Sequence, residues 1–400
     1  MIRSFIRDRE RVFDDLFDQL MAAALVENAR AHTSSGLPGG GVRPVLTRDL
    51  FLSALEVTDG RPRPGPWDDR AVNDSMTPQQ TARRASAAVD AAVVAGRDLG
   101  LTVTDATVLH DLFSVVVHLA PSPVVARIPV VLPHTSGLDA VAHRQRAELD
   151  VARWLADQGT PVIPPSTLVP REPVRRDGHS MTFWEFVEED RGKEPDYAAN
   201  AEIVADLHAA MRGYPGRLSF LSAAEPQSLA ADLALLGERP DLIDPTDLDR
   251  ARREWAALEP LVRSRTAFEQ AFPGIDLQPV HGDSPPANIF SGTAGDLYSD
   301  FELVTLGPVE WDLAALGPEL ESAYDRGARR NGMRTLDGDV LAFVNAVGML
   351  RAVATLTLAP QLPVLVDYLA PAVDQWRTMP FAGGLDLPEE AGRVRRGPAS

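Results

Sequence analysis

The chain lacks cysteine entirely and contains a single lysine, Lys193. The absence of cysteine excludes disulfides, thiol nucleophiles and cysteine-based zinc sites. Any mechanism that needs a lysine elsewhere in the chain is therefore excluded. No apolar run reaches the roughly 18 residues that a membrane span requires. The most apolar window, LAFVNAVGMLRAVATLTLAP, contains Arg351 and is typical of a buried helix.

Positive charge is also scarce, because the formal net charge is −18. An acidic surface opposes nonspecific binding to nucleic acid. It is compatible with a cationic substrate, or it serves solubility alone. The N-terminus is charged throughout and does not resemble a secretory signal. We therefore expect a cytoplasmic protein without a nucleic-acid or membrane partner.

The length of 400 residues allows two or three domains. Residues 1–76 read as an extension, with an amphipathic helix over 4–32, Pro/Gly-rich linkers and a short helix over 47–57. We expect this extension to be a packing arm or a dimerisation element, so that a homodimer is an open alternative. Residues 386–400 read as a flexible tail.

Residues 77–187 are predicted to be β-rich and residues 188–385 mainly helical, which is an α+β organisation. Thr77 followed by Pro78 is a helix-start signal. A second helix is expected over 143–159. The strands expected in this half are 104–111, 113–121, 123–131, 167–172 and 179–188. The helices expected first in the other half are 197–213, 228–238 and 247–265, and a further strand is expected over 297–304.

The stretch HGDSPPANIF, residues 281–290, follows an apolar-bounded run and contains two prolines. Two prolines forbid a helix there, so the stretch is a rigid loop leaving a strand. Asp283 and Asn288 from this loop, with Asp300 from the return of a hairpin, make an all-oxygen set. Such ligands suit magnesium, which commonly serves phosphoryl transfer. Asp283 would then be the base that deprotonates an acceptor hydroxyl.

These residues also carry a resemblance. HGDSPPAN resembles the His-x-Asp-x-x-x-x-Asn loop of the aminoglycoside phosphotransferase and choline kinase-like family. SDFE, residues 299–302, is similar to that family's second magnesium motif, and GPVEWDLAAL, residues 307–316, to the segment after it. Order and spacing match over roughly residues 80–380. The resemblance implies a two-lobed protein-kinase-like fold, with a small antiparallel N-lobe containing one key helix, a larger helical C-lobe and ATP between them.

The resemblance implies a role for each matched residue. Asp283 matches the catalytic base, and Asn288 and Asp300 match the two magnesium ligands. Phe290 falls where an apolar side chain lies under the adenine. Two further matches are structural: Asp312 braces the loop, and His281 packs and hydrogen-bonds within it.

The resemblance also implies a phosphate anchor on the third strand, paired with a glutamate on the next helix. Arg127 is the only basic residue of that strand, and Glu148 is the only glutamate of the helix over 143–159. Arginine stands where such kinases commonly have lysine, and it can bridge phosphates through two N–H groups. The alternative is that Arg127 and Glu148 form an ordinary surface pair.

The turn that would cover the phosphates reads HDLFS, residues 110–114, and contains no glycine. Backbone amides could still approach the phosphates there, and Ser114 could donate a hydrogen bond. Val125 is expected to form a wall of the adenine pocket. The chain from Val187 to Glu189 is expected to supply the backbone groups of the hinge.

Other readings of these motifs are weaker. A protein kinase would need an activation segment, for which SDFELVTLGPVEWDLA leaves no room. A metallophosphatase would need further histidine and aspartate ligands in loops, whereas His118, His143 and His208 fall in expected strands or helices. A catalytically silent kinase-like module that binds a nucleotide or metabolite stays open as an alternative. So does the acceptor, which could be an aminoglycoside, another sugar, a choline-like alcohol or a macrolide.

Overall fold

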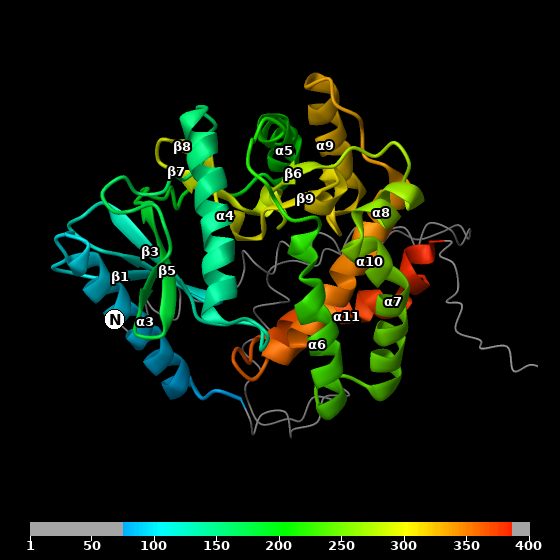
Figure 1. Ribbon diagram of the computed structural model, residues 1–400, viewed down its shortest axis with the longest axis horizontal. Coiled ribbons are helices and arrows are strands. Elements are labelled where there is room, and N and C mark those ends of the chain that lie inside the picture. The colour runs from blue at the N-terminus through cyan, green and yellow to red at the C-terminus, as the bar shows by residue number, and fades with distance from the viewer. Residues whose placement is uncertain (1–74, 386–400) are drawn as a thin grey trace, which may run out of the picture.

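A computed structural model describes residues 75–385. The helices expected over 4–32 and 47–57 and the tail at 386–400 lie outside the described residues. The described chain forms two lobes (Figure 1): a sheet with α3 and α4, and a larger assembly of helices. This is the α+β protein-kinase-like fold that the resemblance implied.

Helix α3, Pro78–Asp98, begins where the sequence signal placed it. The Thr77 hydroxyl accepts a hydrogen bond from the Gln80 N–H at 3.3 Å, and the Gln80 side chain accepts one from the Thr77 N–H at 2.7 Å. This reciprocal cap satisfies two N–H groups that the first helical turn leaves without partners. The alanines of α3, buried at 88, 91, 92 and 95, let the helix pack closely on the sheet.

The sheet of the smaller lobe has the strand order β1-β2-β3-β5-β4, and every pair is antiparallel. The prediction of a strand over residues 167–172 is wrong. Residues 167–172 form bends instead, because Pro170 has no N–H to donate and the Ser166 hydroxyl accepts from the Leu168 N–H at 3.2 Å. The strands are β1 Thr107–Asp111, β2 Ser114–His118, β3 Val124–Pro129, β4 Val174–Arg176 and β5 His179–Glu185.

The two faces of this sheet pack against different parts of the protein. Val124, Ala126 and Ile128 of β3 pack under α3 in the core of the smaller lobe. Successive strand residues point to opposite faces, so Val125 and Arg127 face the other way. That face meets α4, Leu138–Asp157, and the larger lobe. The strand therefore directs its one basic side chain toward the junction of the lobes.

Helices dominate the larger lobe around one apolar core. Within the described residues, the segment Gly338–Leu358 has the length and apolar composition of a membrane-spanning helix, and most of it is buried inside the protein. The α-helices are α5 Tyr197–Met211, α6 Pro226–Leu235, α7 Pro245–Arg263, α8 Arg265–Ala271, α9 Gly317–Arg330, α10 Gly338–Thr355 and α11 Leu365–Thr378. The short 3₁₀ helices are η2 Ser222–Ala224, η3 Leu236–Glu238, η4 Pro285–Ala287, η5 Phe301–Leu303, η6 Val309–Leu313, η7 Leu356–Leu358 and η8 Phe381–Gly384.

Two antiparallel strand pairs flank the loops that contain the motifs. β6, Gln278–Val280, pairs with β9, Thr305–Gly307, and β7, Ile289–Gly292, pairs with β8, Gly295–Tyr298. The strand expected over 297–304 is interrupted, because the chain turns into η5 after β8. The turn occurs at Asp300, whose φ of 62° is left-handed and incompatible with a strand.

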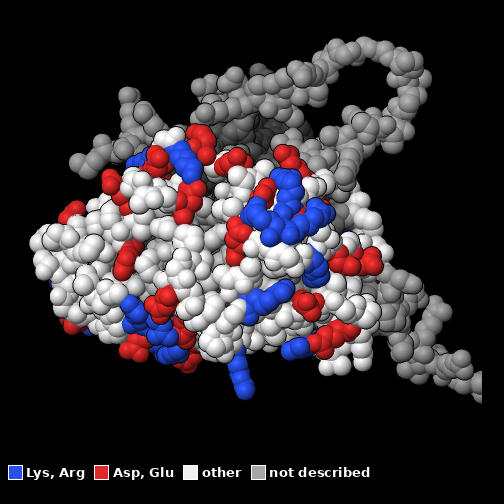
Figure 2. Space-filling model, turned by 90° about the horizontal axis from the view of Figure 1, so that it is seen from above, with Lys and Arg blue, Asp and Glu red and all other residues white. Residues whose placement is uncertain are grey.

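The face of the molecule over α5 and α9 carries acidic and basic side chains side by side (Figure 2). Arg326 and Arg330 of α9 pair with Glu202 of α5, and Arg330 also pairs with Asp206. Exposed pairs of this kind contribute little to stability. On this face the charges alternate in sign, which supports solubility and offers no wide patch of one sign.

Candidate active site

The loop at 281–288 is held in a backbone shape that requires glycine at one position. Gly282 has a φ of +93°, and a Cβ there would lie 1.9 Å from the Leu303 carbonyl oxygen. Any other residue would clash with this neighbouring backbone. Ser284 also has a positive φ, 31°, before η4 begins. The loop is therefore a fixed platform for Asp283.

Asp312 of η6 braces this platform, as the resemblance implied. Its two carboxylate oxygens accept hydrogen bonds from the backbone N–H groups of His281 at 2.8 Å and Gly282 at 2.7 Å. His208 of α5 contacts the same carboxylate at 2.9 Å, and both side chains are fully buried. The Trp311 indole N–H donates to the Gly282 carbonyl at 3.0 Å. Hence η6 and α5 set the position of the loop.

His281 has a structural environment. Its side chain is fully buried, and its Nε2 donates to the Ser299 carbonyl at 2.8 Å. Its ring lies 4.7 Å from the ring of Phe301, the aromatic residue of the SDFE motif. The contact joins the loop to the turn that carries Asp300.

Asn288 and Asp300 offer oxygen donors of the kind that magnesium prefers. The Asn288 amide nitrogen donates to the Asp283 carbonyl at 2.6 Å, which directs the amide oxygen away from that backbone group. The buried Asp300 carboxylate oxygen Oδ1 lies 2.7 Å from Arg127 Nη2, so in this structure it is paired with that guanidinium. No cluster of three or more acidic, histidine or cysteine side chains suited to a metal occurs in residues 75–385. A site with two protein ligands fits magnesium, since this ion keeps waters and binds phosphate oxygens.

Arg127 lies at the centre of a four-residue cluster that spans both lobes. Its Nη1 lies 2.9 Å from Glu148 of α4, so the two residues do form the pair that the resemblance implied. Its Nη2 lies 2.7 Å from Asp300 and 2.7 Å from Glu302. The Glu148 side chain is 2% exposed, which excludes an ordinary surface pair.

Three carboxylates around one guanidinium leave an excess of negative charge. Burial raises the pKa of Glu148 to about 8, against the attraction of Arg127 and with the repulsion of Asp300 and Glu302. Burial also raises the pKa of Glu302. For Arg127, burial lowers the pKa, but the three carboxylates outweigh it and leave the pKa above its ordinary value. The raised pKa values of the two glutamates reduce this excess, because both carboxyls keep a proton up to a higher pH than an exposed glutamate does.

Asp283 lies among both acidic and basic neighbours. Burial raises the pKa of its carboxyl, and the charges of Arg351 and His281 oppose that rise. Glu302 and Asp312 add to it. Such an environment suits a carboxyl that must take up a proton during a reaction.

Two residues of this site were missed from the sequence. Glu302 is the last residue of the SDFE motif, so its signal was present beside Asp300. Arg351 is the only charged residue in the stretch 340–355 of α10, and a lone arginine in an apolar helix was the available signal. It was read there only as evidence that the helix is buried.

The glycine-free turn at 110–114 packs against the other lobe. Leu112 and Phe113 contact the apolar core of the larger lobe, together with Val130 from the end of β3. The Phe113 carbonyl accepts from the Val130 N–H at 2.9 Å. Ser114 is 6% exposed at the start of β2. The turn thus closes over the junction of the lobes.

The residues expected around an adenine lie along one edge of the junction. Val125 packs with Trp184 of β5. Val187 lies beside Gly292 of the β7–β8 turn, and the Glu188 carbonyl accepts from the Thr293 N–H at 2.9 Å. In β7, Ile289 packs toward α5, so the next residue, Phe290, faces the opposite side of the hairpin.

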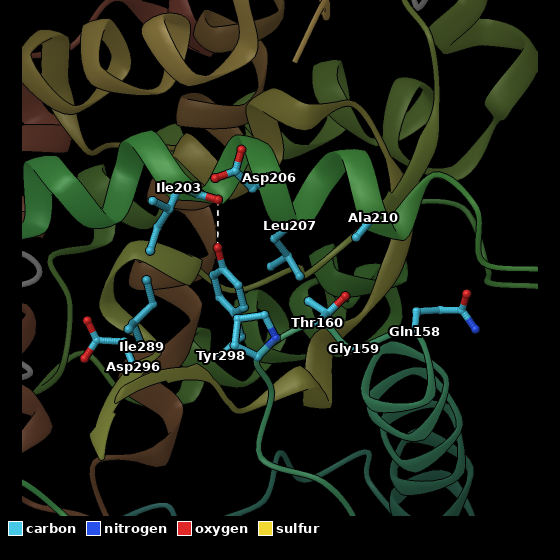
Figure 3. A pocket seen from close by; sticks show the side chains of 11 residues that line it. Gln158, Gly159, Thr160, Ile203, Asp206, Leu207, Ala210, Ile289, Asp296 and Tyr298 are labelled. Carbon is cyan, nitrogen blue, oxygen red and sulfur yellow. Dashed lines mark hydrogen bonds between the residues drawn. The ribbon is translucent and has the colours of Figure 1, made fainter. Parts of the chain in front are cut away.

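A separate cavity of about 380 Å³ lies between the end of α4, α5 and the β7–β8 hairpin (Figure 3). The Tyr298 hydroxyl donates across it to the Ile203 carbonyl at 2.7 Å. None of the residues predicted for the active site lines it. Its lining residues are Gln158, Gly159, Thr160, Pro161, Ile203, Asp206, Leu207, Ala210, Ile289, Asp296 and Tyr298.

Comparison with known proteins places this geometry in a family. Residues 113–344 match the model of the phosphotransferase enzyme family. No curated protein matches the chain. Solved structures with a similar fold include the GDP and kanamycin complex of APH(2″)-IIIa, at 14% identity and a TM-score of 0.46, covering 72% of this chain and 96% of that one.

Two further solved structures are similar. Choline kinase LicA from Streptococcus pneumoniae has 15% identity and a TM-score of 0.46, over 71% of this chain and 98% of that one. A spectinomycin phosphotransferase in complex with ADP and spectinomycin has 11% identity and a TM-score of 0.44, over 72% and 97%. Because the family model spans more than half of its length, this chain belongs to the phosphotransferase enzyme family and is a small-molecule kinase.

Proposed function

We propose that this kinase transfers the γ-phosphate of ATP to a hydroxyl of a small molecule. The observation that carries the proposal is Arg127, which bridges Glu148 of the smaller lobe and Asp300 of the larger one. One guanidinium thereby joins the strand that would hold phosphates to the turn that would hold their metal. Arginine suits this task because its planar fork can contact two oxygen groups at once.

Each residue of the loop then has a role. Asp283 accepts the proton of the acceptor hydroxyl and orients that oxygen for attack. The Asn288 amide oxygen and the Asp300 carboxylate would hold magnesium. Magnesium, when bound, supplies positive charge to the phosphate oxygens. Arg127 exchanges part of its contact with Asp300 and Glu302 for the α- and β-phosphates of ATP.

The remaining predicted residues bind the nucleotide. Val125 and Phe290 enclose the adenine, and the chain at Val187 supplies hinge backbone groups. Ser114 and the backbone of its turn cover the phosphates after the turn lifts from the larger lobe. The acceptor that we propose is an aminoglycoside, an amino sugar or a similar alcohol.

The decisive experiment measures ATP consumption over a panel of hydroxylated small molecules. We expect turnover with at least one acceptor, and Asp283→Asn should lower that turnover by about 10²–10⁴-fold. A wild-type chain that binds ATP but turns over with none of the panel, or an Asp283→Asn variant as fast as wild type, contradicts the proposal.

A second candidate is a catalytically silent kinase-like module that binds a nucleotide or metabolite. The observation that favours it is the closed junction, in which Leu112 and Phe113 pack against the larger lobe and the turn has no glycine. Measurable turnover excludes this candidate.

A further inference from the structure

Glu225 joins the two lobes on the side of α4 that is remote from the β7–β8 hairpin. Its carboxylate pairs with Arg144 of α4 and lies 3.5 Å from Arg351 of α10. The three side chains are 23–31% exposed, so the water around them is limited. No motif of the sequence includes Glu225.

One partner of Glu225 belongs to the helix that orients Arg127. Arg144 lies one turn before Glu148 in α4, on the same face of the helix. Glu148 in turn holds the Arg127 guanidinium. A fixed Arg144 therefore fixes the rotation and height of α4 relative to the larger lobe.

The other partner belongs to the helix beside the catalytic loop. The Asn345 side chain of α10 accepts a hydrogen bond from the Ala315 N–H at 2.7 Å, just after η6, and Asp312 of η6 braces the loop of Asp283. The charge of Arg351 also opposes the rise in the pKa of Asp283. Arg351 is the only charged side chain in the stretch 340–355 of α10. Glu225 thus connects the helix behind Arg127 to the helix that holds η6 and, through η6, the loop of Asp283.

The backbone at Glu225 supports a positional role. Its φ and ψ are 46° and 51°, a left-handed conformation that side chains other than glycine and asparagine rarely adopt. Such a conformation persists where the surroundings over-determine the position, and it is concentrated at functional sites.

Two further hydrogen bonds join the lobes near Glu225. The Thr135 hydroxyl lies 2.7 Å from that of Ser228 in α6, and the Gln361 side chain donates to the Leu132 carbonyl at 3.0 Å. The chain just before α4 contacts α6 and the segment before α11, whereas the far end of α4 lies near β7 and β8 (Figure 1). The lobes are therefore joined at both ends of α4.

We propose that Glu225 is a positioning residue for phosphoryl transfer, which couples the Arg127–Glu148 pair to the loop carrying Asp283 through Arg144 and Arg351. The inference rests on the proposed function, because the reaction is what the coupling serves. A misplacement of the reacting groups by about 1 Å can cost about 10²-fold in rate.

The kinetic test compares Glu225→Gln with Glu269→Gln, which removes an exposed pair with Arg265 on α8. We expect Glu225→Gln to lower kcat by about tenfold or more, while the Kd for ATP changes less than about threefold. Glu269→Gln should leave both unchanged. Arg144→Gln, which spares the strained backbone of Glu225, should reproduce the loss, and the double variant should lose no more than either alone. Equal kcat for Glu225→Gln and Glu269→Gln, or additive losses in the double variant, overturns the proposal.

A distance measurement separates this inference from the proposed function. The chain has no cysteine, so Leu168→Cys and Arg329→Cys place one spin label on each lobe at exposed positions. We expect Glu225→Gln, but not Glu269→Gln, to broaden or lengthen the distance between the labels. If the wild-type protein shows no turnover, the proposed function fails, but the distance between the labels still tests the role of Glu225. A changed distance in Glu225→Gln supports coupling of the lobes by Glu225, and an unchanged distance distribution overturns it.

Discussion

Arg127 Nη2 lies 2.7 Å from a carboxylate oxygen of Asp300, although the two residues come from different lobes. The same guanidinium holds Glu148 at 2.9 Å. Both ends of the fork are therefore engaged, one in each lobe. Arg127 thus links the two lobes directly through its two ion pairs.

Replacement of the Arg127 guanidinium by a lysine ammonium should reduce activity without abolishing it. Arg127→Lys keeps one positive charge and loses the two-sided contact, so we expect turnover to fall by about tenfold or more and the Kd for ATP to rise. Glu148→Gln should reduce turnover less, because it removes orientation and keeps the charge of Arg127. Steady-state kinetics with a working acceptor provide the measurement. An Arg127→Lys variant with wild-type kinetics would show that Arg127 does not hold the phosphates.

Arg127→Ala should act differently, because it leaves Glu148 buried without its partner. We expect a loss of about 3–5 kcal/mol in the free energy of unfolding, measured by urea titration. Arg127→Lys should retain most of that stability. The two variants thus separate the role of Arg127 in the fold from its role toward ATP.

Metal dependence tests the role of Asp300. Asp300→Asn tolerates the left-handed backbone at this position but removes the negative charge. Calorimetric titration with ATP should show that magnesium strengthens binding to wild type and to Asp296→Asn, a control in an exposed pair with Lys193. For Asp300→Asn the gain from magnesium should vanish. Retention of the full gain would assign the metal to other residues.

Asp312 should matter for stability as well as activity. Asp312→Asn places an amide N–H₂ among the N–H donors of His281 and Gly282, so one buried donor loses its acceptor. We expect about 2–4 kcal/mol less free energy of unfolding, together with lower turnover. Asp244→Asn is the matched control, since Asp244 caps α7 and asparagine caps helices equally well. Equal stability of the two variants would show that the brace is dispensable.

Asp232 of α6 provides a pH test away from the catalytic loop. The side chain is 6% exposed, one of its oxygens has no hydrogen-bond partner, and burial raises its pKa to about 6. The unfolded chain loses this proton near pH 4, whereas the folded chain keeps it until about pH 6. Stability contributed by the neutral form is therefore present at low pH and is lost as the pH rises through 6.

Asp232→Asn is neutral at every pH and should escape this loss. Its advantage over wild type in the free energy of unfolding should grow by about 1 kcal/mol between pH 5 and pH 8. Urea titrations of both proteins at the two pH values give the comparison. An advantage that is constant with pH would mean that the Asp232 carboxyl titrates at its ordinary pKa in the folded protein.

The sequence by itself was sufficient to predict the structural elements that depend on interactions between residues close together in the chain. The Thr77 cap, the strand of Arg127 and the loop of Asp283 follow from side-chain caps, strand alternation and proline, which act over a few residues. The fold and the kinase activity were implied by the resemblance of three motifs, in order, to those of a known family, and both are confirmed by the family match. The strand predictions failed at 167–172, where Pro170 and a side-chain hydrogen bond favour bends, and after Tyr298, where the left-handed Asp300 ends the strand.

Only the tertiary structure decided which charges meet. Glu302 contacts Arg127, and Arg351 lies 3.5 Å from Glu225, because η5 and α10 bring residues from distant parts of the chain to the same place. The contacts of Glu225 could not be predicted from the sequence either, because its partners Arg144 and Arg351 lie far from it in the chain and on different helices. Coulombic interactions and burial depend on distance in space, which no spacing along the sequence reports.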